Sequence, residues 1–179
     1  MENLKIPPYN IEAEQSVLGS MLLSKDAIYV AEERLKPDDF YKDSHRQIFE
    51  VMINLNEDRE PVDLITVSEV LRSNKILEQV GGVIYLTTLT ETVPTAANIA
   101  HYCKIVEEKA MLRRLINTTS SILSLAYDPQ NEVEELLDVA EQKIFEIVQK
   151  QKVENFHHIK DVLFSTFERI EELYNSDGA

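Results

Sequence analysis

The 179-residue chain has little of what breaks a helix and almost none of what forms a disulfide. It contains four glycines, six prolines and a single cysteine, Cys103. One cysteine excludes an internal disulfide, and its helical spacing beside Tyr102 and Val106 predicts burial as a small hydrophobe. No apolar run approaches the ~18 residues of a membrane span, so we expect a reduced cytoplasmic setting. Scarce breakers among many Leu, Ile, Glu and Lys residues favour long helices over a sheet.

The chain is also poor in positively charged residues. The chain carries 18 Lys and Arg residues against 32 Asp and Glu residues, a net charge of −14, and the acidic excess is spread over both halves. Binding to nucleic acid phosphates requires a concentrated basic face. The composition therefore argues against tight DNA binding by this chain alone, and it favours a basic partner or simple solubility.

Motifs for chemistry are missing as well. None of the four glycines is followed by lysine, which excludes the phosphate loop, and no Gly-x-Ser-x-Gly turn presents a serine nucleophile. Glu154 and His157 have the Glu-x-x-His spacing of helical di-metal sites, but such a site needs a second copy of the motif, which the sequence lacks. His45 and His101 are lone histidines, each expected to be packed or solvent-facing. We expect no catalytic residue, cofactor or metal ligand in this chain.

Residues 10–93 are predicted to form a compact body of short helices, because apolar residues recur at helical spacing between turn signals. Asn10 can cap the first helix, and Gly19 within that helix can let another backbone come close. The run Thr66-Val67-Ser68-Glu69 has the form of a capping box and predicts the start of the fourth helix. The fifth helix is expected to stop before Pro94.

Two longer helical patterns follow, over residues 98–126 and 132–149, and the turn between them predicts an antiparallel hairpin. The first helix is apolar on several sides, whereas one partner helix covers only one stripe. The surplus predicts a second contact with the body, with another copy of the chain or with another protein. The expected matching stripe on the second helix comprises Val133, Leu136, Leu137, Ala140, Ile144 and Val148.

A polar stretch near residues 149–155 precedes a last predicted helix over residues 159–174. Its apolar face comprises Ile159, Leu163, Phe167 and Ile170, at heptad-like spacing. We expect this face to dock on a missing domain or on another subunit, the alternative being that it folds back on the body. The chain thus divides into a globular helical body (1–95), a helical hairpin (96–150) and a linker helix (151–179).

Several ordered blocks carry a resemblance to a known family. They are Pro7-Pro8-Tyr9-Asn10-Ile11-Glu12, Asp39-Phe40-Tyr41 with His45, Gly81-Gly82 with Tyr85-Leu86, Val93-Pro94-Thr95-Ala96-Ala97-Asn98, Arg113-Arg114-Leu115-Ile116 and Ile159-Lys160-Asp161-Val162-Leu163. No block is specific alone, but the ordered set spans nearly the whole chain. It resembles the N-terminal domain, with its linker helix, of the DnaB family of bacterial replicative helicases, and the hairpin resembles the Gram-positive branch.

The resemblance implies an all-α fold and a role in assembly. In that family the hairpins of N-terminal domains pair, and the pairs form a collar on a hexameric ATPase ring that encircles single-stranded DNA. Primase docks on the collar through its C-terminal helicase-binding domain, a helicase loader is a further candidate partner, and the linker helix packs against a neighbouring ATPase domain. ATP, Mg²⁺ and unwinding would belong to the parent's ATPase domain, which is absent from this chain.

Candidate surface residues follow from these roles. Partner-docking candidates are Glu12 and Tyr85 on the body with Ile116 and Ile122 on the hairpin, and subunit-pairing candidates are Ile105, Leu112 and Leu115. Ile159, Leu163, Phe167 and Ile170 form the docking face of the linker helix. Two rival readings stay open. One is a stand-alone adaptor or regulator with the collar fold, and the other is a helical metalloenzyme, which would require bound metal at stoichiometric level.

Overall fold

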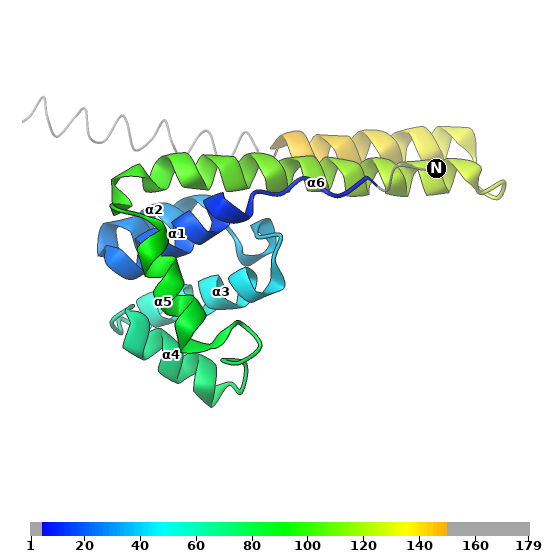
Figure 1. The fold of residues 1–179 in the computed structure, drawn as a ribbon. Coiled ribbons are helices and arrows are strands. Elements are labelled where there is room, and N and C mark those ends of the chain that lie inside the picture. Colours follow the sequence, from blue (N-terminus) through cyan, green and yellow to red (C-terminus); the bar gives the residue numbers. More distant parts are fainter. Residues whose placement is uncertain (1–4, 150–179) are drawn as a thin grey trace, which may run out of the picture. The chain divides into compact units, whose positions relative to one another are not determined.

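A computed structural model describes residues 5–149, and all regular structure in this range is helical (Figure 1). The elements are α1 (Ile11–Leu23), α2 (Lys25–Arg34), the 3₁₀ turn η1 (Pro37–Asp39), α3 (Asp43–Glu57), α4 (Leu64–Ser73), α5 (Gly82–Thr92), the 3₁₀ turn η2 (Ala96–Asn98) and α6 (Ile99–Tyr127). A further helix occupies residues 133–149. The predicted all-α fold is confirmed. The contacts divide the chain into two compact units, Met1–Arg114 and Leu115–Ala179.

Helix α1 is the central element of the first unit and contacts α2, α3 and α5. Its core side presents Val17, Leu18 and Met21, all fully buried, and the rings of Phe40 and Phe49 lie 4.8 Å apart in the same core. Because apolar burial is the main favourable term in folding, this shared core holds the short helices together. The described part of the chain contains no helix long and apolar enough to cross a membrane.

The first turns of α6 belong to this unit. They bury Ile99, Cys103, Val106 and Ala110. The predicted burial of Cys103 is confirmed, and desolvation, with a smaller contribution from the charge of Glu107, raises the pKa of its thiol to about 12. The thiol is therefore protonated and packed as a small apolar group. The predicted domain boundary at residue 95 stays a prediction.

The caps of the helices follow the sequence signals in one case and depart from them in another. The Asn10 side chain accepts a hydrogen bond from the Ala13 amide at 2.9 Å, as predicted for the cap of α1. The capping box predicted at Thr66 is wrong by about one turn, because Asp63 caps α4 instead. Its Oδ1 accepts from the amides of Ile65 and Thr66, and the Thr66 hydroxyl accepts from the Asp63 amide. These amide bonds lower the pKa of Asp63.

Gly19 allows α1 and α5 to pack at close range. A Cβ at this position would overlap the carbonyl oxygen of Leu89 and lie 3.3 Å from a methyl group of Val93. The prediction that another backbone approaches Gly19 is confirmed. Since the obstacle is backbone, a side chain here cannot be accommodated by a change of rotamer.

The second unit contains the end of α6 and the helix of residues 133–149, joined by a tight turn (Figure 1). In the turn, the Asp128 carboxylate accepts from the Gln130 amide at 3.0 Å, and the Asn131 side chain donates to the Leu125 carbonyl at 2.9 Å. The predicted hairpin is confirmed. Its predicted stripe is only partly right, because Leu136 and Ala140 are half-buried whereas Val133, Leu137, Ile144 and Val148 are exposed. The side chains of this helix that are half-buried, and not exposed, are those at positions 136, 140, 143 and 147.

Replacing Gly19 with alanine is expected to destabilise the chain by about 2–3 kcal/mol, the cost of overpacking against a fixed backbone. The free energy of unfolding, measured by urea denaturation, checks this. Ser20→Ala is the matched control, because Ser20 is equally buried and its hydroxyl bonds only the Ser16 carbonyl of its own helix. A loss below about 0.5 kcal/mol for Gly19→Ala would contradict the close packing of α1 and α5.

Lys75→Gly is expected to raise the free energy of unfolding by about 0.5–1 kcal/mol. Lys75 follows α4 with φ of 60°. The next residue, Ile76, donates its amide hydrogen to the Leu71 carbonyl at the end of the helix. Glycine adopts this left-handed conformation without the penalty that a Cβ brings. Lys75→Ala is the control, since it shortens the side chain but keeps the Cβ. Equal gains from both substitutions would show that the lysine side chain, and not the backbone, is responsible.

Candidate partner-binding site

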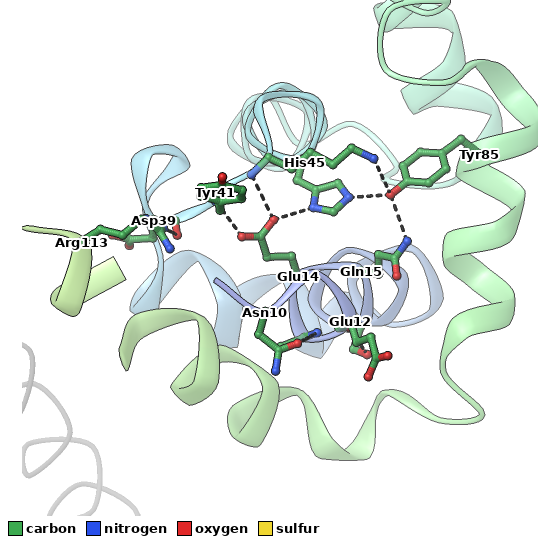
Figure 2. A network of polar contacts seen from close by, with 12 residues as sticks. Asn10, Glu12, Glu14, Gln15, Asp39, Tyr41, His45, Tyr85 and Arg113 are labelled. Atoms are coloured by element: carbon green, nitrogen blue, oxygen red, sulfur yellow. Dashed lines mark hydrogen bonds and ion pairs between the residues drawn. The ribbon is translucent and has the colours of Figure 1, made fainter. Parts of the chain in front are cut away.

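A buried chain of polar side chains joins three helices of the first unit (Figure 2). Glu14 on α1 is 1% exposed, and His45 on α3 is completely buried. The Nδ1 atom of His45 lies 2.6 Å from the Glu14 carboxylate, and its Nε2 atom lies 2.6 Å from the hydroxyl oxygen of Tyr85 on α5. Tyr85 is only half-buried, so this series of hydrogen-bonded side chains extends from the core to the surface.

The partners determine the direction of each hydrogen bond. A carboxylate only accepts, so the Nδ1 atom of His45 carries a proton and donates it to Glu14. The Tyr85 oxygen has three polar neighbours: His45 Nε2, Gln15 Nε2 at 3.1 Å and Lys42 Nζ at 3.5 Å. The amide and ammonium nitrogens can only donate. The bond between Tyr85 and His45 Nε2 runs from the phenol to the ring when the imidazole is neutral, and from the ring to the phenol when the imidazole is protonated.

The Glu14 carboxylate also anchors the segment before α3. It accepts from the Tyr41 amide at 2.6 Å and from the Lys42 amide at 3.4 Å. A buried carboxylate without donors is strongly destabilising, and here backbone amides and an imidazole supply them. Glu14 therefore positions Lys42, and with it the start of α3, relative to α1.

At the surface, Lys42 lies against the exposed side of Tyr85. Its ammonium nitrogen is 4.6 Å from the centroid of the Tyr85 ring, within the range of a cation–π contact. Lys42 itself is exposed and Gln15 is half-buried. Figure 2 shows Gln15 and His45 approaching the Tyr85 hydroxyl from different sides, and the Lys42 ammonium group contacts the same oxygen. We call Gln15, Lys42 and Tyr85 the Tyr85 face.

A second polar cluster attaches α6 to the same region of the first unit. Arg113 donates to the Pro8 carbonyl at 2.7 Å and to the Asp39 carbonyl, and Arg114 forms an ion pair with the buried Asp39 carboxylate. Burial lowers the pKa of Arg113, while the charges of Glu14 and Asp39 oppose that shift. The Tyr41 ring stacks on Tyr9 with centroids 4.5 Å apart. These contacts hold the N-terminal segment, η1 and α6 together.

The structure distributes the predicted docking residues over different surroundings. Tyr85 is the outer end of the buried polar chain, whereas Glu12 is exposed on α1 and points away from it (Figure 2). Ile116 is 44% exposed and Ile122 is half-buried within the second unit. Glu12 and Tyr85 therefore do not form one cluster.

The predicted subunit-pairing residues also differ among themselves. Leu112 and Leu115 are exposed, whereas Ile105 is half-buried and packs against the core of the first unit. The predicted linker-helix residues Ile159, Leu163, Phe167 and Ile170 lie outside the described residues, as do Glu154 and His157. Within residues 5–149 no three His, Cys, Asp or Glu side chains gather as ligands for a metal ion.

The sequence did not predict roles for Glu14, Gln15 and Lys42, nor the partners of His45. His45 is packed, one of the two outcomes expected of it, but its partners are 31 and 40 residues away in the sequence. Local spacing carries no sign of such contacts. The available signal was the charge of Glu14 itself, because it falls at helical spacing with the buried Val17 and Leu18.

Removing one partner of the buried pair should be costly. His45→Leu leaves the Glu14 carboxylate buried without its imidazole donor, and we expect a loss of about 3–5 kcal/mol in the free energy of unfolding. Glu14→Gln removes the buried charge. The loss in the free energy of unfolding of the double variant should therefore be smaller, by about 1–3 kcal/mol, than the sum of the losses of the two single variants. Urea denaturation of the four proteins measures this coupling. Strict additivity would mean that the two side chains do not depend on each other.

The chain is similar to proteins of a known family. Residues 6–108 match the model of the DnaB-like helicase N terminal domain family. The replicative DNA helicase DnaC of Bacillus subtilis is 49% identical over 176 residues, which cover 98% of this chain and 39% of that protein. The chain therefore spans about two fifths of the length of this relative. The predicted resemblance to a Gram-positive branch agrees with this match.

Two solved structures are also similar. The crystal structure of the N-terminal domain of DnaB helicase from Mycobacterium tuberculosis matches with a TM-score of 0.75 and 43% identity, covering 79% of this chain and 99% of that one. A structure described as a DnaB-like replicative helicase and its interactions with primase matches with a TM-score of 0.64 and 27% identity. That match covers 84% of this chain and 35% of the helicase chain.

Proposed function

Since the chain belongs to the family of DnaB-like helicase N-terminal domains, we propose that it acts as the collar domain of a bacterial replicative helicase. In this proposal it pairs with copies of itself, supports assembly of the helicase ring and docks primase. ATP and Mg²⁺ binding, and passage of single-stranded DNA, belong to the ATPase part of the parent protein in the bacterial cytoplasm. The chain itself contains no phosphate loop and does no chemistry.

The observation that carries the proposal is the exposed apolar surface of the second unit. Its described residues leave ten large apolar side chains exposed: Leu115, Ile116, Leu123, Tyr127, Val133, Leu137, Val139, Ile144, Phe145 and Val148. Large exposed apolar surfaces mark interaction sites in soluble proteins. A dimer formed through this hairpin, or a trimer of such dimers, would cover it. A symmetric dimer uses the same patch on both copies, so the exposed apolar side chains of one hairpin would meet those of the other.

Primase docking is supported by the chemistry of the first unit and by one relative. The helicase structure that matches this chain is described together with its interactions with primase. In this chain Tyr85 offers a half-buried aromatic ring held by hydrogen bonds, a type of residue that often anchors an interface. Tyr85 and Glu12 on the first unit are separate candidates for contacts with primase, as are Ile116 and Ile122 on the second unit. In this proposal the linker helix and a helicase loader act in the assembly of the parent ring.

Sedimentation and titration together test this function. The wild-type chain should sediment as a dimer or larger species at micromolar concentration and should bind the C-terminal helical domain of primase. Ile116→Glu should weaken one of these two associations at least tenfold, because a charge would be buried at an apolar contact. Helicity and thermal stability should remain unchanged, since the Ile116 side chain is already 44% exposed.

Ile65→Glu is the matched control, because Ile65 is a 79% exposed isoleucine on α4 in the first unit. It should leave both associations intact. A chain that stays monomeric and does not bind the primase domain would refute the proposed function. A collapse of helicity in Ile116→Glu would instead make Ile116 a core residue of the hairpin.

A further inference from the structure

We infer that the Tyr85 face, formed by Gln15, Lys42 and Tyr85, receives a carboxylate of the docking protein, and that the buried Glu14–His45 pair positions it. The inference rests on the proposed docking function and adds the chemistry of the group that binds. It depends on a feature of the polar chain: which of its hydrogen atoms remain available at the surface.

The Tyr85 oxygen is already engaged within the chain, because His45 Nε2 lies 2.6 Å away and Gln15 Nε2 and Lys42 Nζ both donate to it. Donors that remain are those of Lys42 and Gln15. An ammonium group carries three hydrogens and a side-chain amide carries two, so each keeps at least one free after contacting Tyr85. The Gln15 carbonyl is the one acceptor that this face adds. The face is therefore a cationic donor site on an otherwise acidic chain.

The ammonium group of Lys42 is held in place before any partner arrives. It lies 4.6 Å from the Tyr85 ring centroid and 3.5 Å from the hydroxyl oxygen, while the Lys42 amide is anchored by Glu14. Ordering a lysine side chain normally costs conformational entropy when a complex forms. Here the polar chain has already restricted both ends of the residue. An ordered ammonium group with free hydrogens is complementary to a carboxylate.

The charges around Lys42 favour a single carboxylate over a nucleic acid. Asp43 follows Lys42 in the sequence and is exposed, and the chain as a whole carries a net charge of −14. An extended row of phosphates would be repelled by this surface, because binding a polyanion needs several cations in a stripe. A single acidic side chain on a protein needs only one ordered cation with a hydrophobic ring beside it. We therefore assign the partner an acidic residue that pairs with Lys42.

The Glu14–His45 pair acts through Tyr85 and does not touch the partner. Glu14 orients the His45 ring through Nδ1, and Nε2 of the same ring holds the Tyr85 hydroxyl oxygen, which is the atom that Lys42 contacts. Glu14 and His45 are therefore positioning residues.

Calorimetric titration of the whole chain with the primase C-terminal helical domain tests the inference. Lys42→Met removes the charge and keeps an unbranched apolar side chain, and it should raise the Kd by about tenfold and reduce its dependence on salt. Lys25→Met is the matched control, because Lys25 is also an exposed lysine over a tyrosine ring, 5.9 Å from that of Tyr29, and lies on α2 outside the polar chain. It should change the Kd by less than about twofold.

Positioning is tested by combining Lys42→Met with Tyr85→Phe. If the hydroxyl orders Lys42, the effect of Lys42→Met on the Kd should shrink in the Tyr85→Phe background, measured at a temperature at which circular dichroism shows all four proteins folded. A purely structural role for Tyr85 would give additive effects on the Kd. Lys42→Glu should abolish binding, and a Glu→Lys or Asp→Lys substitution in the primase domain should restore it.

The outcomes separate this inference from the proposed function. If the wild-type chain binds the primase domain and Lys42→Met and Lys25→Met behave alike, the docking function stands and the assignment to Lys42 is wrong. If a fluorescent single-stranded oligonucleotide binds the wild-type chain and loses affinity in Lys42→Met, the site recognises phosphate and the inference is overturned. If the wild-type chain binds no primase domain at all, the proposed function itself fails.

Discussion

The rest of the first unit depends on a buried carboxylate. Glu14 lies on the core side of α1 among apolar residues, where an unpaired charge would cost more than a small domain can tolerate. Three donors satisfy it: the amides of Tyr41 and Lys42 and the imidazole of His45. Because these donors have defined positions, the charge determines how η1 and α3 meet α1. Through His45 it also positions the hydroxyl oxygen of Tyr85 on α5.

The two units have surfaces of different character. The first unit combines a closed apolar core with a polar chain that orders a few surface groups. The described part of the second unit, residues 115–149, is a helical hairpin with many exposed apolar side chains. An uncovered apolar surface supplies affinity with little directionality, whereas ordered hydrogen-bond donors supply selectivity. The proposed self-pairing and primase docking would draw on both properties.

Much of the fold was predictable because its signals are local. Asn10 caps the helix that follows it, Gly19 permits a close approach, and Cys103 falls on a buried face at helical spacing. The capping box at Thr66 was misplaced because both Asp63 and Thr66 are good cap residues, and the position of α4 in the body decides between them. The apolar stripe on the second hairpin helix was only partly predicted. The helices carry so many apolar residues that more than one line of contact between them is compatible with the sequence.

Composition and spacing alone determined that this chain is helical, acidic and without a phosphate loop, because these are properties of neighbouring residues and of totals. They also determined that its long helices carry more apolar surface than one partner helix covers. Only the tertiary structure decided that Glu14, His45 and Tyr85 form one chain of hydrogen bonds. Their separation in the sequence is 31 and 40 residues, and no local pattern constrains side chains so far apart. The physical reason is that a buried charge must be hydrogen-bonded by donors that lie near it in the folded structure, wherever those donors stand in the sequence.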